Sequence, residues 1–275
     1  MYHKYFSVTE PGRKVEHGYK ITTNKHNIAF LHVEPGPISL HRAFDIYKEL
    51  KKDRDNLGGI VLLPGDHNSR KQKNIGFNIP MEIDSDISIT SDDPTNCTIF
   101  GGLIVQGVDC KLTSITVESS RFDGVHINEE GKLRMINVHI NNSGGCGVLS
   151  EGFTTMMNCK ITGSKFSGIK VKSASTLWLS GHKKSITKNC TLDNYTSFGL
   201  NVVERSTILL MSTIPEIDQG VAVNASFLKA INMVDVIPAA KMSDGNFNKR
   251  NIYVEEQSYI RAIDYKVLEE YETVD

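Results

Sequence analysis

The sequence has no long hydrophobic run and no excess of charge of either sign. No window approaches the ~18 apolar residues that a membrane-spanning helix needs, and the N-terminal stretch MYHKYFSVTEPGRK has no apolar core of the kind found in secretory signals. We therefore expect no membrane span and no export by that route. The 31 Lys and Arg residues nearly balance the 32 Asp and Glu residues. No overall basic field exists to attract nucleic acid, and none is expected as a partner.

Cysteine is also sparse, and its spacing argues against two structural roles. The five cysteines are an odd number and include no CxxC pair, which disfavours both a disulfide framework and a zinc site. Reduced thiols in an intracellular setting fit this pattern, and no metal or cofactor is expected. The 275 residues, 39% of them hydrophobic, are enough for one large or two small domains with a buried core.

The chain does contain an internal repeat. The stretch NVHINNSGGCGVLSEG runs from Asn137 through two alternating apolar residues and a polar bend to Gly147 and beyond. This order occurs in five copies, and in each the glycine lies nine residues after the first apolar position. The steps between the glycines are 23, 21, 31 and 21 residues, which is typical of a solenoid whose units bury their apolar faces on their neighbours. The five glycines are Gly124, Gly147, Gly168, Gly199 and Gly220.

Each copy is interpreted as one coil with two or three short strands, because apolar residues alternate with period two on both sides of the bend. Stacking the coils in parallel puts Val138, Cys159 and Cys190 in one interior column, so these cysteines are interpreted as small buried hydrophobic residues. The glycines are expected to give the corner its backbone freedom. A third column should join side-chain amides by hydrogen bonds along the stack, and its members are Asn137, Asn158, Asn189 and Asn232.

Three further segments flank the repeats. The stretch ISLHRAFDIYKEL predicts an amphipathic helix over residues 39–51, placed to cover the open strand edges at the first end of the stack. Residues 1–37 are predicted to form an irregular N-terminal arm, and residues 38–250 the repeat domain. In the tail, residues 251–275, apolar residues at near-helical spacing are compatible with a helix that covers the other end or docks outside.

The 31-residue step contains an insertion, TLWLSGHKKS, which is roughly ten residues longer than its counterparts. It holds the only tryptophan, Trp178, beside His182 and Lys183. Insertions in repeat proteins map to loops on one face and often bind partners. Two interpretations stay open: the loop packs Trp178 on the side of the stack, or it forms a contact surface. Lys160 and Lys170, in outward positions of the coils, are the other binding candidates.

The helix, the segment IVLLPGDH and the glycine-spaced coils, from about Ser39 to Val236, resemble the right-handed parallel β-helix or pectin-lyase-like superfamily, including its carbohydrate-binding and sugar-hydrolase-type repeats. The resemblance implies an all-β fold, a single-stranded right-handed parallel β-helix with an N-terminal capping helix. It implies no single function, because the members include polysaccharide lyases, glycoside hydrolases, uronan epimerases, and phage and virus surface proteins.

The segment RFDGVHI resembles the Asn-Thr-Asp-Gly segment of polygalacturonases, with Asp123 at the position of the aspartate. In that family two further aspartates stand on the next coil, whereas here Gly144 and Gly145 occupy those positions. The outward positions of the two strands contain no carboxylate. His126 and His139, one coil apart on different strands, complete the list of candidate catalytic residues.

Two hypotheses follow. The favoured one is a non-catalytic β-helix that acts as a rigid structural or recognition module, either in a virion or capsid or as a scaffold that binds carbohydrate or protein. The alternative is a polysaccharide-active enzyme, a uronan lyase, epimerase or glycoside hydrolase, with a diverged site. The expected partners are accordingly a protein or a polysaccharide, in a homo-oligomer or a larger assembly, and the expected location is the cytoplasm or a virion.

Overall fold

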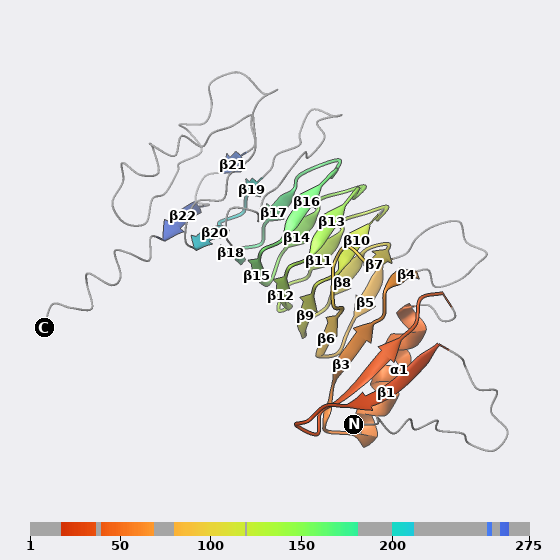
Figure 1. Cartoon of the computed structure of the whole chain (residues 1–275). Coiled ribbons are helices and arrows are strands. Elements are labelled where there is room, and N and C mark those ends of the chain that lie inside the picture. Colours follow the sequence, from red (N-terminus) through yellow and green to blue (C-terminus); the bar gives the residue numbers. More distant parts are fainter. Residues whose placement is uncertain are drawn as a thin grey trace, which may run out of the picture.

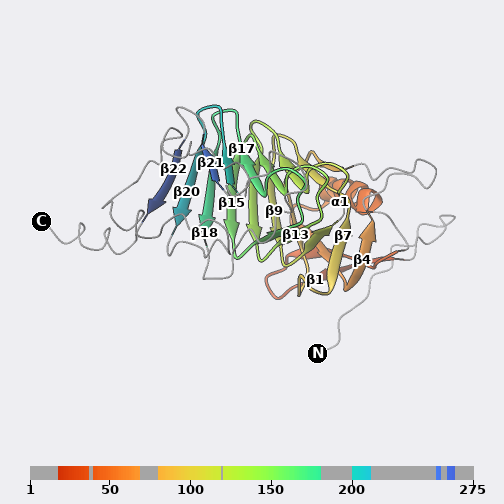
Figure 2. The same ribbon diagram turned by 90° about the horizontal axis from the view of Figure 1, so that it is seen from above.

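The chain folds as a stack of parallel β-coils. The computed structural model describes residues 18–36, 40–68, 80–118, 120–180, 200–211, 252–254 and 259–263. Strands of successive coils lie side by side, from β1 and α1 at one end to β21 and β22 at the other (Figures 1 and 2). Every neighbouring pair is parallel except β1 and β2, which are antiparallel. The all-β prediction is confirmed.

Three sheets make up the walls of the stack, and one coil passes through all three, as in β10, β11 and β12. Sheet B contains β4 (Gly65–Asn68), β7 (Cys97–Phe100), β10 (Thr116–Glu118), β13 (His139–Asn141) and β16 (Lys160–Thr162). Sheet C contains β5 (Met81–Ile83), β8 (Leu103–Val105), β11 (Val125–Ile127), β14 (Val148–Ser150), β17 (Ile169–Val171), β19 (Leu200–Val202) and β21 (Ile252–Val254). Sheet A is the longest and contains β1 (Tyr19–Thr23), β2 (Ala29–Val33), β3 (Leu57–Leu62), β6 (Ile87–Thr90), β9 (Asp109–Thr113), β12 (Lys132–Ile136), β15 (Phe153–Met157), β18 (Thr176–Ser180), β20 (Thr207–Met211) and β22 (Tyr259–Ile263).

The core is the interior of the stack, where the alternating residues of all three sheets meet. Val138 and Cys159 of the predicted interior column are buried, and the four cysteines that the structure describes are free thiols. Period-two alternation therefore sorted these side chains correctly between core and surface. Cys190 lies outside the described residues.

The glycine column is confirmed for Gly124, Gly147 and Gly168, because the backbone N–H of Val125 donates to the Gly147 carbonyl and that of Val148 to the Gly168 carbonyl, each at 2.9 Å. The expected reason was wrong, since neither Gly124 nor Gly147 has a positive φ. A Cβ on Gly124 would lie 2.4 Å from Ile140 Cγ2 and 2.7 Å from the Gly147 carbonyl oxygen. These glycines are needed because the next coil leaves no room for a side chain.

Gly199 and Gly220, the last two glycines of the predicted column, lie outside the described residues. The strand that pairs with β19 on its far side is β21, with Leu200 opposite Ile252. The sequence did not single out this pairing, because alternation alone does not tell which of several alternating segments will lie beside a strand.

The asparagine column is a turn rather than a ladder of amides. Ser114, Asn137 and Asn158 follow the ends of β9, β12 and β15 with φ of 55°, 54° and 54°, a left-handed conformation that Asn tolerates better than most residues. In the described part of the chain the column has one side-chain hydrogen bond, from Asn137 Nδ2 to Ser114 Oγ at 3.2 Å. Asn189 and Asn232 lie outside it.

Both end segments differ from their predictions. Residues 18–36 are not an irregular arm but contain the hairpin β1–β2, whose turn is closed by Asn24 Oδ1 accepting from the His26 and Ile28 N–H groups. In the tail, Tyr259 to Ile263 form β22, which pairs with β20, so these residues are not helical and the stack extends past residue 250. The apolar spacing of this short run fits a strand as well as a helix, and strand pairing decides between them.

The predicted helix 39–51 is α1 (Leu40–Asp53), which lies beside β3 at the first end of the stack (Figure 1). Its buried residues are Leu40, Ala43, Phe44, Ile46 and Tyr47, which join the main core. That α1 protects the strand edges at this end stays a prediction. No helix of the described residues has the length and apolar character to cross a membrane.

Candidate functional site

Asp123 lies in the bend before β11 and binds the next coil. Its Oδ1 accepts a hydrogen bond of 2.6 Å from the backbone N–H of Cys146. A Cβ on Gly145 would lie 2.4 Å from the same oxygen, and one on Gly144 would lie 2.1 Å from the Arg121 carbonyl oxygen. No carboxylate pair could therefore occupy positions 144 and 145 in this backbone, and the partner that the next coil supplies to Asp123 is the Cys146 N–H.

The two candidate histidines lie on different sheets. His139 is on β13 in sheet B, between Thr116 and Lys160, whereas His126 is on β11 in sheet C. Burial lowers the pKa of His139, the nearby Lys160 ammonium lowers it further, and Asp93 opposes both effects. The candidate pair is thus not brought together, and Lys160 and Lys170 are likewise separated, on β16 and β17.

His126 belongs to a charged cluster with two residues that the sequence did not single out. Its Nε2 lies 3.6 Å from Glu151 Oε1, and this buried nitrogen makes no hydrogen bond. Lys172 Nζ lies 2.6 Å from the same Glu151 oxygen. The hydrogen bond to Glu151 raises the pKa of Lys172. Only 16% of the Glu151 side chain is exposed, and the Lys172 ammonium is the cation that holds this largely buried carboxylate in place.

Glu151 lies next to the outward positions in which no carboxylate was expected, without occupying one of them. It comes one residue after β14 ends at Ser150, just outside the columns that alternation defines. Its backbone N–H donates to the Ile127 carbonyl of the preceding coil at 2.8 Å, so it still stacks in register. Extending each predicted strand by one residue at its end would have identified Glu151.

Trp178 lies in a strand, not in the insertion loop. It is on β18, between Thr155 of β15 and Leu209 of β20. Its ring meets the ring of Phe153 edge to face, with centroids 5.8 Å apart, and the two residues are 39% and 40% exposed. His182 and Lys183 lie outside the described residues.

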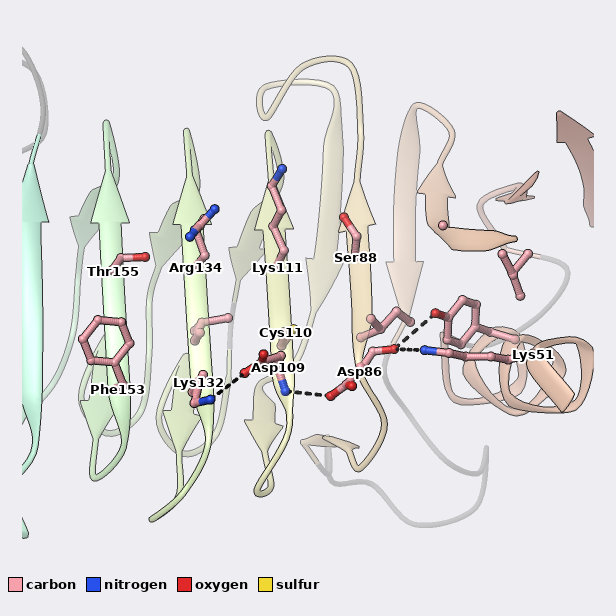
Figure 3. A pocket seen from close by; sticks show the side chains of 15 residues that line it. Lys51, Asp86, Ser88, Asp109, Cys110, Lys111, Lys132, Arg134, Phe153 and Thr155 are labelled. Atoms are coloured by element: carbon pink, nitrogen blue, oxygen red, sulfur yellow. Dashed lines mark hydrogen bonds and ion pairs between the residues drawn. The ribbon is translucent and has the colours of Figure 1, made fainter. Parts of the chain in front are cut away.

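A groove of about 480 Å³ crosses the outer face of sheet A beside α1. Figure 3 shows two rows of side chains along it: Ser88, Lys111, Arg134 and Thr155 in one, and Asp86, Asp109, Lys132 and Phe153 in the other. Each row takes one residue from each of β6, β9, β12 and β15 or from the turn before β6, so the groove runs along the stack and across the strands.

The acidic side of the groove is largely neutralised from within. Lys132 Nζ lies 3.8 Å from Asp109 Oδ1, and the Asp109 N–H donates to Asp86 Oδ1 at 2.9 Å. Lys51 of α1 donates to the Asp86 carbonyl oxygen at 2.9 Å. These contacts tie the helix and three coils into one wall.

The sequence held a signal for this groove in its repeat spacing. Positions 111, 134, 155 and 178 are separated by 23, 21 and 23 residues, close to the glycine steps. Tracing that offset back from Trp178 gives Thr155, Arg134 and Lys111, the outward row of the third strand of each coil. In the described residues no group of three or more His, Cys, Asp or Glu side chains is arranged to hold a metal ion.

Comparison with known proteins gives a family and no named relative. No curated protein and no solved structure matches the chain significantly. A family model described as "Right handed beta helix region" matches residues 78–232, more than half of the chain. This match agrees with the three parallel sheets and the coil-by-coil register, and the chain belongs to the right-handed β-helix family.

Proposed function

We propose that this protein is a non-catalytic recognition module that binds a polysaccharide chain in the groove of sheet A. The observation that carries the proposal is the Phe153–Trp178 pair, whose two rings stand about 40% exposed beside the groove. Aromatic faces give the apolar side of a sugar ring a flat contact, and the polar groups around them can bind its hydroxyls.

The scaffold suits this role because every groove residue except Asp86 stands on a strand or on α1. Phe153 and Thr155 are on β15, which is paired on both sides by β12 and β18. Side chains held on paired strands lose little conformational freedom when a ligand binds. An extended polysaccharide is also a repeating ligand, as a stack of coils is a repeating surface.

A structural role in a virion or another assembly is the other non-catalytic function that the sequence predicts. It rests on the resemblance to phage and virus proteins, whereas polysaccharide binding has the groove and its aromatic pair as a physical basis. A protein partner would use the same exposed rings, and it becomes an outcome of the test.

The test is binding of a polysaccharide panel by affinity electrophoresis and calorimetry. We expect F153A and W178A each to weaken binding of the best probe by about tenfold, the loss that removing a central aromatic contact usually causes. F122A and F166A are matched controls, because these rings are 54% and 52% exposed and lie outside sheet A. Equal loss in the controls, or no binding of any probe, would contradict the proposal.

The cluster on sheet C favours a second candidate, a polysaccharide-active enzyme. His126 Nε2 makes no hydrogen bond, and Glu151 beside it is held by Lys172, so a neutral imidazole could accept a proton next to a cation. This arrangement suits a uronan lyase or epimerase better than a glycoside hydrolase, which needs two carboxylates across the bond that it breaks.

The enzyme candidate is tested by turnover. The protein should be incubated with pectate, alginate and hyaluronan, with and without calcium, while reducing ends and the absorbance of unsaturated uronates are followed. We expect no turnover. Turnover that H126A abolishes while binding persists would overturn the non-catalytic interpretation.

A further inference from the structure

One row of sheet A presents a graded series of side chains along the groove. In strand register the row runs Ser88, Lys111, Arg134, Thr155 and Trp178, one residue from each successive coil. Strands in a sheet are about 4.8 Å apart, so the row is about 19 Å long. It begins with a small hydroxyl, passes two cations and ends at an aromatic ring.

The two cations are the unusual members of this row. Lys111 and Arg134 are register partners on β9 and β12, both side chains are exposed, and in the described part of the chain neither has an ion pair. The neighbouring Lys132, by contrast, is paired with Asp109 at 3.8 Å. Like charges directly opposite on adjacent strands are destabilising. An anion bound between them would remove that repulsion.

The geometry points to an acidic polysaccharide as the ligand, with a carboxylate or sulfate group bound between Lys111 and Arg134. This inference rests on the proposed function and adds the ligand's charge to it. The Arg134 guanidinium offers a planar pair of donors that matches two oxygens of one anionic group, while the Lys111 ammonium adds a point charge beside it.

The position of the anion also determines the direction in which the polysaccharide crosses sheet A. The sugar two coils from Arg134 meets Trp178, and Phe153 reaches the same point from β15, where the two ring centroids lie 5.8 Å apart in an edge-to-face arrangement. Thr155 lies between the anion and the rings. The ligand therefore crosses the strands, with its charged group toward α1 and a sugar face toward β18.

The opposite side of the groove limits where the charge can sit. Both carboxylates stand in the second row: Asp109 is two residues before Lys111 on β9, and Asp86 precedes β6 in the neighbouring coil (Figure 3). An anion on that side would meet carboxylates, so it is directed to the row of Lys111 and Arg134.

The experiment compares three probes on the intact protein: neutral dextran, dextran sulfate, and uronans without sulfate, namely pectate, alginate and hyaluronan. We expect at least one acidic probe to bind and dextran to bind at least about tenfold more weakly, with affinity falling as salt screens the contact. Dextran sulfate and the uronans separate sulfate from carboxylate recognition. K111Q and R134Q should each weaken the acidic probe by about tenfold, the usual effect of losing one charge-assisted hydrogen bond.

K25Q is the matched control, since it removes the same charge from the exposed turn between β1 and β2, away from the residues that line the groove, and should leave affinity unchanged. Loss in K25Q equal to that in R134Q would overturn the inference, because net charge rather than the groove would then decide. A neutral probe that binds as well as the acidic ones, with no effect of R134Q but a loss in W178A, would overturn this inference and leave polysaccharide binding standing. Failure of every probe would overturn both.

Discussion

Asp123 lies in a segment that resembles a catalytic motif, yet the next coil supplies its partner. The Cys146 N–H points at Oδ1 from 2.6 Å, and Gly145 leaves the space that the carboxylate fills. Cys159 is a second example: it carries a thiol, but its place in the stack buries it in the core. In both cases the stacked neighbour, not the residue type, determines what the side chain does.

We predict that D123A lowers the free energy of unfolding by about 1.5 kcal/mol, the lower end for a hydrogen bond to a charged acceptor, because Asp123 is partly exposed. D123N keeps a carbonyl oxygen toward Cys146 and should lose less than half as much. Urea denaturation measures both. D92A, at an exposed turn, should stay within about 0.5 kcal/mol of the parent chain. A D123A variant as stable as the D92A variant would show that Asp123 does not stabilise the fold.

The buried thiols predict a loss of stability at alkaline pH. Burial raises the pKa of Cys159 from 9.0 to about 12. Above pH 9 the unfolded chain releases this proton and the folded chain keeps it, so the unfolded state binds fewer protons and stability falls as pH rises. Between pH 9 and 11 each such thiol removes about 1.4 kcal/mol per pH unit.

C159V isolates this effect, because Val138 fills the same column position one coil earlier. We expect the parent chain to lose about 1.4 kcal/mol more per pH unit than C159V over this range. Urea titrations at pH 8 to 11 give the two slopes. Parallel slopes would mean that the thiol ionises in the folded state.

At the scale of elements, coil-to-coil contact explains the glycine column and the corners. Gly147 has an ordinary φ, but a Cβ there would lie 2.4 Å from Ile161 Cγ2 and 2.6 Å from the Gly168 carbonyl oxygen. Gly107 is the opposite case, with a φ of +62° and no atom within 4 Å of an added Cβ. One glycine is required by space and the other by backbone conformation.

We predict that G147A costs about 3 kcal/mol, the upper range of overpacking, whereas G107A costs about 1 kcal/mol for its left-handed φ. Thermal and urea unfolding compare the two. I161A, which removes the clashing Cγ2, should not rescue G147A, because the Gly168 carbonyl is backbone and cannot move aside. Equal costs for the two alanines would argue against close stacking at this column.

At the scale of the whole molecule, the stack is a one-dimensional array in which each coil contacts its neighbours. β12 is paired on both sides, by β9 and β15, whereas within the described residues β1 is paired only with β2. Stability should therefore be lowest at the first end and highest in the middle coils.

Hydrogen exchange tests this gradient. We expect the paired amides of β12 to exchange at least roughly a hundredfold more slowly than those of β1, because the middle strand opens only with larger parts of the stack. Mass spectrometry of peptides covering residues 19–23 and 132–136 gives the comparison. Uniform protection along the chain would show a single cooperative unit instead.

The sequence by itself determined the β-helix and much of its interior. Fixed glycine spacing and period-two alternation are local properties, so they placed Val138, Cys159 and Gly147 correctly before any pairing was known. A third local property, the recurrence of apolar residues at helical spacing, placed α1. Each of these features depends on the residue's own strand or helix and needs no knowledge of which segment lies beside it.

Only the tertiary structure decided what lies next to what. The partner of Asp123, the meeting of His126 with Glu151, and the choice of β21 as the neighbour of β19 all depend on contacts between coils. The groove of sheet A arises in the same way, since Lys111, Arg134 and Phe153 come from three coils and become one surface by stacking. Alternation tells whether a side chain points in or out, but register between separate segments sets its neighbours, and that register is fixed by hydrogen bonding and packing across the whole stack.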